Sequence, residues 1–214
     1  FNCISLEKID ITSFNMSNVI DISFMFYNCS SLKSIDLSNF KANNIKDMSN
    51  FFVNCHSLKS LNLEKFDTSK VTTMKNMFMD CYSLTSLNLS NFNTEMVRDM
   101  SFMFSNCNSL EIVDISSFNT YSTGDIRYMF YNCSSLTELD LYNFNTYNVK
   151  DVSCMFNSCT SLISLNIASF NLMNADRYFT IFDGCYNLTL TIVPEYCYKI
   201  MDSIPKYINV IEII

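Results

Sequence analysis

Eight cysteines recur along this chain of 214 residues at a constant spacing of 26 residues. Thiolates act as nucleophiles, bind metals and form disulfides, so the chemistry of this column has to be considered first. A structural zinc site needs cysteine or histidine ligands at short spacings. The column has no short spacing and no histidine partner, and we therefore expect no metal and no cofactor. The periodic residues are Cys3, Cys29, Cys55, Cys81, Cys107, Cys133, Cys159 and Cys185.

The chain has ten cysteines, an even number that would permit a disulfide framework. In a repeat protein, however, equivalent residues of neighbouring coils lie ~4.8 Å apart with parallel side chains. A disulfide needs Cβ atoms about 3.8 Å apart that lean toward each other. Disulfide pairing would also draw coils together in pairs and make the spacing between coils unequal. Free cysteine, in contrast, is commonly buried as a small apolar residue. The constant spacing therefore favours a ladder of buried thiols over disulfides.

His56 is the single histidine of the chain, and it directly follows Cys55, which suggests a nucleophile and its base. Consecutive residues of an extended segment point to opposite faces. A nucleophile and its base must be within hydrogen-bond contact. We therefore expect Cys55 to point inward and His56 to be exposed and solvated. The sequence predicts a protein that is not an enzyme.

Two acidic columns appear when each periodic cysteine is counted as position 1. Calcium bound between coils is one interpretation, but known calcium-binding solenoids rely on glycine-rich loops, and this chain has only two glycines. The interpretation we favour is local hydrogen bonding from these side chains to backbone N–H groups. Position 8 holds Asp10, Asp36, Asn62, Asn88, Asp114, Asp140 and Asn166, and position 19 holds Asp21, Asp47, Thr73, Asp99, Asp125, Asp151 and Arg177.

The elements that position these columns follow from the rest of the repeat. Leucine at position 4 and aliphatic residues at positions 7 and 9 give the spacing Leu-x-x-Leu-x-Leu, which is typical of the strand of a leucine-rich repeat. Phenylalanine fills positions 12 and 24 in seven coils each, so we expect both columns to stack in the core. The tail of each repeat predicts a second short strand and about one helical or 3-10 turn, capped by serine at position 21.

These patterns predict an α/β repeat solenoid. It is expected to be a right-handed, leucine-rich-repeat-like coil with parallel short strands and short helical or 3-10 turns. Residues 1–184 hold seven tandem repeats, and we expect further repeats before Phe1 in the parent protein. The repeat pattern is lost after Cys185, so residues 185–214 are predicted to form a divergent C-terminal capping coil.

Composition excludes several other classes of protein. The formal net charge is −7 and the charges are scattered, so no nucleic acid is expected as a partner. No stretch of about 18 apolar residues occurs, so we expect no membrane insertion. Only two glycines and two prolines are present, which excludes collagen-like chains and most glycine-loop nucleotide folds.

The stretches "CSSLKSIDLSNF", "FDTSKVTTMKNMFMDC" and "FNTYNVKDVSCMFNSC" carry a resemblance to a known family. The chain resembles the BspA-like leucine-rich-repeat surface proteins over residues 3–184. The resemblance implies an extracellular or surface-anchored binding scaffold, because several members of the family are implicated in adhesion. It implies a protein or glycan ligand without naming one.

Specificity in such a scaffold must come from variable exposed positions. Tyr121 and Tyr147 share position 15 of adjacent coils, so we expect them to lie ~5 Å apart. Tyr142 lies at position 10 of the same coil as Tyr147. Tyrosine is enriched at interface hot spots, and we expect these three to contribute to a recognition patch. The alternative is an incidental aromatic group that only covers a wide turn.

Two other roles stay open besides surface binding. One is a structural spacer that holds another segment away from a surface. The other is an intracellular, cytoplasmic protein-interaction scaffold, in which reduced cysteines would be stable. The first coil, with Cys3, Leu6, Ile9 and Phe14, has no covering segment, so weak end-to-end self-association is also expected.

Overall fold

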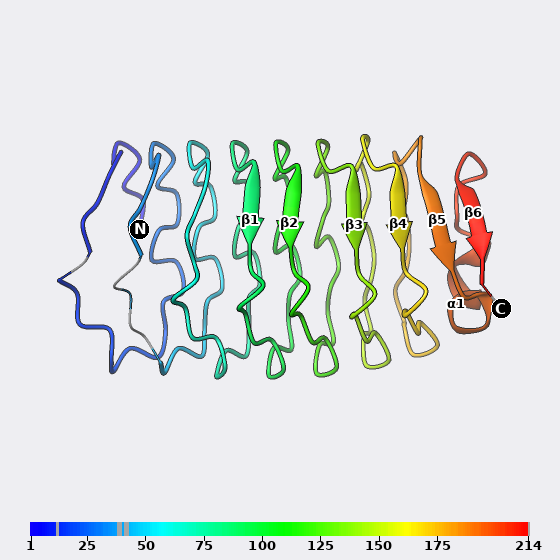
Figure 1. Ribbon diagram of the computed structural model, residues 1–214, viewed down its shortest axis with the longest axis horizontal. Coiled ribbons are helices and arrows are strands. Elements are labelled where there is room, and N and C mark those ends of the chain that lie inside the picture. The colour runs from blue at the N-terminus through cyan, green and yellow to red at the C-terminus, as the bar shows by residue number, and fades with distance from the viewer. Residues whose placement is uncertain (12, 38–39, 41–42, 214) are drawn as a thin grey trace.

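The computed structural model describes residues 1–11, 13–37, 40 and 43–213 of the chain. Successive 26-residue segments lie side by side along the longest axis of the molecule, and the chain runs from one end to the other (Figure 1). In order, the elements are β1 (Ser86–Asn88), β2 (Ile112–Asp114), β3 (Glu138–Asp140), β4 (Ser164–Asn166), β5 (Thr189–Ile192), α1 (Pro194–Met201) and β6 (Asn209–Glu212).

The strands pair in parallel with a register of one repeat. Leu87 of β1 is opposite Val113 of β2, and Leu139 of β3 is opposite Leu165 of β4. In β1 and β3 the central leucine is buried between two exposed neighbours, which is the alternation of a strand with one covered face. The parallel strands are consistent with the predicted repeat solenoid. The right-handedness of the coil stays a prediction, and so does the boundary at residue 184 between the repeats and the capping coil.

The opposite side of each coil differs from the expected strand and helical turn. It begins with a single parallel bridge at position 19, such as that between Asp99 and Asp125. A run of turns follows, and two residues in each run have left-handed backbone, for example Phe102 at φ 59° and Asn106 at φ 60°. Positive φ interrupts a right-handed helix. The predicted helical or 3-10 turn is therefore wrong, and α1 is the one helix among the described residues.

Backbone groups in this run of turns alternate between two kinds of partner. The N–H groups of Met100, Phe102 and Phe104 donate to carbonyls of the next coil, whereas the N–H group of Met103 donates to Met100 of its own coil. Every second amide therefore binds the neighbouring coil. Because buried backbone groups must be paired, this alternation substitutes for regular secondary structure.

The core runs without a break through the stack, as expected from the two phenylalanine columns. Rings at position 24 stack between adjacent coils, for example Phe104 on Phe130 with centroids 5.3 Å apart. At position 12, Phe92 and Phe118 are both 1% exposed. Phe14 occupies the same column but is 48% exposed, and it belongs to the first coil, for which the sequence predicts no covering segment.

The last part of the chain continues the sheet and adds a helix. β5 pairs with β4, and β6 pairs with β5, so the four-stranded sheet runs from β3 to β6. Pro194 begins α1 at a position where its missing N–H has no cost. Cys197 and Ile200 of this helix are buried against the core cluster. The segment predicted as a cap therefore contributes both a strand edge and a helix to this end.

Candidate functional site

The periodic thiols are used in backbone hydrogen bonding. All ten cysteines are free, and all except Cys3 are buried. The Sγ atom of Cys133 donates to the carbonyl oxygen of Phe104 at 3.2 Å, and Cys159 donates to Phe130 at 3.0 Å. Burial raises the pKa of the Cys133 thiol well above its ordinary value. A protonated, buried thiol is a poor nucleophile and metal ligand.

The Cys55–His56 pair does not form a catalytic arrangement. Cys55 is buried, burial raises its pKa to about 12, and its Sγ atom donates to the carbonyl of Phe26. His56 is half-buried, and its ring stacks on Tyr82 at a centroid distance of 4.7 Å. His56 was expected to be exposed, and this is wrong because the tyrosine of the next coil covers one face of its ring.

The acidic columns make the local hydrogen bonds that were predicted. At position 19, Asp99 accepts the N–H of Ser101 at 2.9 Å, and at position 8, Asp114 accepts the N–H of Ser116 at 3.0 Å. Asp151 additionally lies 3.6 Å from a guanidinium nitrogen of Arg127. The described residues contain no group of three or more His, Cys, Asp or Glu side chains arranged to hold a metal ion.

All three predicted tyrosines follow the same local motif, an Asx turn. In each, a backbone N–H donates to the Oδ1 atom of an Asn or Asp two residues earlier: Asn119 for Tyr121 at 3.0 Å, Asp140 for Tyr142 at 2.9 Å and Asn145 for Tyr147 at 3.1 Å. The three side chains are 59%, 66% and 52% exposed.

Asparagine side chains of the next coil bind the backbone carbonyls of two of these tyrosines. Asn148 donates its Nδ2 group to the carbonyl of Tyr121 at 2.7 Å, and Asn174 donates to the carbonyl of Tyr147 at 3.0 Å. Each tyrosine backbone is therefore fixed within its own coil and by the coil that follows. A recognition side chain on a fixed backbone loses little conformational entropy on binding.

The three tyrosines line one open groove with a volume of about 520 Å³, here called the tyrosine groove. Tyr196 of α1 lines it as well and is 40% exposed. The backbone carbonyl of Tyr196 accepts the N–H of Leu172 at 2.8 Å, which ties α1 to the last coil. Tyr196 lies outside the repeat columns and was not predicted from the sequence. Only its place in an amphipathic segment after Pro194 could have indicated it.

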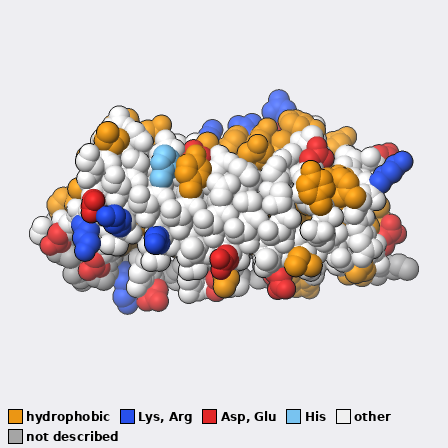
Figure 2. Space-filling model, turned by 90° about the horizontal axis from the view of Figure 1, so that it is seen from above, with side chains coloured by type: hydrophobic (Ala, Val, Ile, Leu, Met, Phe, Trp, Pro, Cys, Tyr) orange, Lys and Arg blue, Asp and Glu red, His pale blue; other side chains and the backbone are white. Residues whose placement is uncertain are grey.

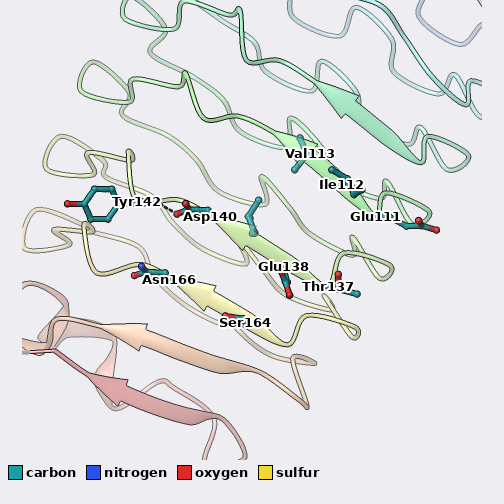
Figure 3. A pocket seen from close by; sticks show the side chains of 10 residues that line it. Glu111, Ile112, Val113, Thr137, Glu138, Asp140, Tyr142, Ser164 and Asn166 are labelled. Atoms are coloured by element: carbon teal, nitrogen blue, oxygen red, sulfur yellow. Dashed lines mark hydrogen bonds between the residues drawn. The ribbon is translucent and has the colours of Figure 1, made fainter.

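A second groove lies on the strand face and has a volume of about 750 Å³. Figure 3 shows its side chains projecting from β2, β3 and β4, with Tyr142 at one end beside Asp140. β2 and β3 belong to different sheets, so hydrogen bonding between described strands is interrupted there. Val113 of β2 is half-buried, whereas the equivalent Leu87 is 3% exposed. Tyr142 lines both grooves and connects them.

Two polar columns that hold the coils together were not recognised from the sequence. Thr94 at position 14 is fully buried, and its hydroxyl donates to the carbonyl of Asn119 at 2.9 Å and accepts the N–H of that residue at 2.8 Å. At position 26, Asn132 donates its side-chain amide to Asn106 at 2.9 Å. The recurrence of threonine two residues after the position-12 phenylalanine could have indicated the first column.

The surface between these features is mostly polar. Figure 2 shows hydrophobic side chains in several separate groups, with charged side chains scattered among them. Among the described residues no helix has the length and apolar character needed to cross a membrane.

Comparison with solved structures finds repeat proteins of low sequence identity. A leucine-rich cell surface protein from Faecalibacterium prausnitzii A2-165 is 17% identical, with a TM-score of 0.33, over 99% of this chain and 74% of the other. A leucine-rich repeat protein from Bacteroides ovatus ATCC 8483 is 16% identical, with a TM-score of 0.21, over 100% of this chain and 85% of the other. No curated protein matches the chain.

A family model matches nearly all of the repeat region. The model is described as "Mycoplasma protein of unknown function, DUF285", and it matches residues 1–112 and again residues 84–193. The two overlapping matches are expected when a family is defined by tandem repeats. The chain therefore belongs to this family of repeat surface proteins, which confirms the resemblance to the BspA-like leucine-rich-repeat proteins.

Proposed function

We propose that this chain is a non-catalytic recognition module of the cell surface, which binds a protein or glycan partner through the tyrosine groove. The observation that carries the proposal is the convergence of four exposed tyrosines, three from the repeats and one from α1, on a single groove. Tyrosine combines a large contact area with a polar hydroxyl at low entropic cost, which suits it to recognition.

The polar ladders make the groove a rigid site. Tyr121 and Tyr147 are each held by an asparagine of their own coil and by another of the next coil. Their backbone geometry is therefore set before any partner arrives. Preorganisation of this kind raises affinity because less order has to be imposed on binding.

Free thiols do not favour an intracellular scaffold over a surface module in this chain. Nine of the ten cysteines are buried, and burial raises the pKa of Cys81, Cys107 and Cys159 well above the ordinary value. Oxidation requires an accessible thiolate. The core thiols are therefore protected outside a reducing compartment as well, and a surface location is compatible with them.

The test uses the double variant Tyr121→Ser, Tyr147→Ser. Serine is the residue that position 15 carries at Ser17 and Ser69, so the fold accommodates it. Labelled wild type and variant are applied to layers of mucin and of a mixed extracellular-matrix preparation. The matched control is Tyr82→Ser, which removes a 42% exposed tyrosine outside the groove.

We expect the double variant to lose at least about tenfold in binding, a difference of ~1.4 kcal/mol, with the melting temperature unchanged. The control variant should bind like the wild type. Equal binding by all three proteins would contradict the recognition proposal and favour the structural spacer, whose continuous phenylalanine core suits it to hold other segments apart.

A further inference from the structure

The tyrosine groove leaves its ring faces without the partners that such rings have elsewhere in the chain. Exposed or half-buried rings at equivalent positions of adjacent coils stack on each other: Phe102 lies on Tyr128 with centroids 4.6 Å apart, and His56 lies on Tyr82 at 4.7 Å. Tyr121 and Tyr147 are also equivalent residues of adjacent coils. Among the described residues, neither makes a ring contact with the other or with Tyr142 or Tyr196, although all four line the groove.

The polar groups of the groove are planar amides and hydroxyls. Asn145 and Asn171 use their Oδ1 atoms to accept the N–H groups of Tyr147 and Met173, at 3.1 Å and 3.2 Å. Both asparagines line the groove, and each also carries an Nδ2 group that can donate hydrogen bonds. Four aromatic faces are therefore combined with side chains that can donate to, and accept from, hydroxyl groups.

The charge of the groove distinguishes it from the rest of the surface. The chain has 14 basic and 21 acidic residues, yet the ten residues lining the groove include no Asp, Glu, Lys, Arg or His. An anionic ligand would meet no cation in the groove, and a cationic ligand would meet no carboxylate. Charge complementarity therefore favours an uncharged ligand.

From these three observations we infer that the tyrosine groove binds an uncharged glycan. A pyranose ring presents apolar C–H faces to an aromatic ring and hydroxyls at its edge to amides, and this matches the composition of the groove. The inference rests on the proposed function and specifies the class of partner.

The experiment titrates neutral oligosaccharides into chain labelled at its tyrosine rings and follows the ring resonances by NMR. The probes are hexasaccharides of β-1,4-glucose, β-1,3-glucose, α-1,4-glucose, α-mannose and N-acetylglucosamine, with oligogalacturonate as the charged comparison. We expect at least one neutral probe to shift the resonances of Tyr121 and Tyr147. The affinity should change by less than about twofold between ~0.05 and ~0.5 M NaCl, because no charge pair is involved.

Variants separate the groove from other surfaces. Tyr121→Ser, Tyr147→Ser should weaken the binding of the active probe at least about tenfold, while Tyr82→Ser should leave it unchanged. The glycan inference is overturned if no neutral probe shifts these resonances. It is also overturned if binding survives the double variant, or if only the charged probe binds and salt removes that binding.

Periodate treatment of the mucin and matrix layers distinguishes failure of this inference from failure of the proposed function. Periodate cleaves vicinal diols of sugars and leaves the polypeptide backbone intact. Loss of tyrosine-dependent binding after treatment supports the glycan. Tyrosine-dependent binding that persists after treatment, while no neutral probe shifts the tyrosine resonances, overturns the glycan, assigns the groove to a protein ligand and leaves the proposed function standing. Binding that never depends on the tyrosines contradicts both.

Discussion

The thiol of Cys107 donates a hydrogen bond to the backbone carbonyl of Phe78, 29 residues earlier in the chain, at 3.2 Å. The same carbonyl accepts the N–H of Cys81 at 3.2 Å, so it closes a turn in its own coil and receives a bond from the next one. A side chain at this place has to be small, apolar and able to donate. Cysteine meets all three conditions, which accounts for its recurrence without any catalytic or redox role.

Thiol reactivity should therefore separate Cys3 from the other nine cysteines. Cys3 is exposed, whereas the others are buried. In the native protein we expect an alkylating reagent to modify Cys3 quickly and the rest only as fast as the protein unfolds. Mass spectrometry of native and denatured samples measures this. Recovery of intact disulfides from fresh, non-reduced protein, or rapid labelling of Cys107 in the native state, would contradict the arrangement.

The stability lost when a position-12 phenylalanine is replaced should depend on how deeply its side chain is buried. Phe92 is 1% exposed, so Phe92→Ala is expected to lower the free energy of unfolding by roughly 3–5 kcal/mol. Phe14 in the same column is 48% exposed, and Phe14→Ala should cost less than about 1 kcal/mol. Urea denaturation of both variants gives the comparison. Similar losses would show that the column is not packed as described.

Two serines at position 21 should respond to alanine in opposite directions. The hydroxyl of Ser101 donates to Asp99 at 2.6 Å, while the equally buried hydroxyl of Ser153 has no hydrogen-bond partner among the described residues. Ser101→Ala should lower the unfolding free energy by about 1 kcal/mol, and Ser153→Ala should raise it by a similar amount. Thermal melts of the two variants measure the difference. A loss of stability in Ser153→Ala would indicate that its hydroxyl has a partner.

Asp125 should oppose folding at neutral pH. Burial is the main cause that raises the pKa of Asp125 above its ordinary value of 3.8. The charges of Asp99 and Asp151 raise this pKa further, whereas Arg127 lowers it. A raised folded-state pKa means that the charged form is disfavoured in the folded protein, and this cost disappears as the pH falls through the folded-state pKa. Asp125→Asn keeps the Oδ1 acceptor and should be more stable than the wild type at pH 7, an advantage that shrinks on acidification.

The control for this pH dependence is Asp114→Asn. Hydrogen bonds from Ser116 hold the pKa of Asp114 below its ordinary value of 3.8. Its contribution is therefore fully present above that value and is lost only at lower pH. Between pH 7 and about pH 5 the stability difference between this variant and the wild type should stay constant. A difference for Asp125→Asn that stays constant until the pH has fallen to the ordinary value of 3.8 would contradict the assignment.

Self-association through the first coil stays a prediction, and the exposed side chains there suggest the test. Phe1, Ile4 and Phe14 are 64%, 56% and 48% exposed. We expect the chain to show concentration-dependent sedimentation, and Phe14→Ser to reduce it. A monomer of constant sedimentation coefficient at high concentration would contradict this expectation.

Much of the fold was predictable because the repeat is strict. A 26-residue period with leucine at position 4 and aliphatic residues at positions 7 and 9 defines a parallel strand, and β1 to β4 lie at the predicted place. The opposite side was not predictable from apolar spacing alone. Residues such as Phe102 and Tyr128 have positive φ, at 59° and 55°, although aromatic residues rarely do. The hydrogen bonds between coils impose that conformation, and a single coil read alone does not reveal it.

The candidate site was predictable in part for the same reason. Tyr121, Tyr142 and Tyr147 stand out against their columns, and all three line one groove. Tyr196 was not predicted because its place at the groove depends on how α1 packs against the last coil. His56 and Tyr82 share position 2 of adjacent coils, so their stacking could have been inferred from the period.

Hydrogen bonds between coils join the same two repeat positions at every step, as shown by the bonds from Cys133 to Phe104 and from Cys159 to Phe130. Deleting or duplicating 26 residues therefore returns each group to a partner of the same kind, while losing a single residue shifts every later column away from its partner. We therefore expect insertions and deletions in such an array to preserve the fold when they add or remove whole coils. Unequal recombination within the coding sequence can lengthen or shorten the molecule without redesigning it, and the variable exposed positions of each new copy are then free to diverge.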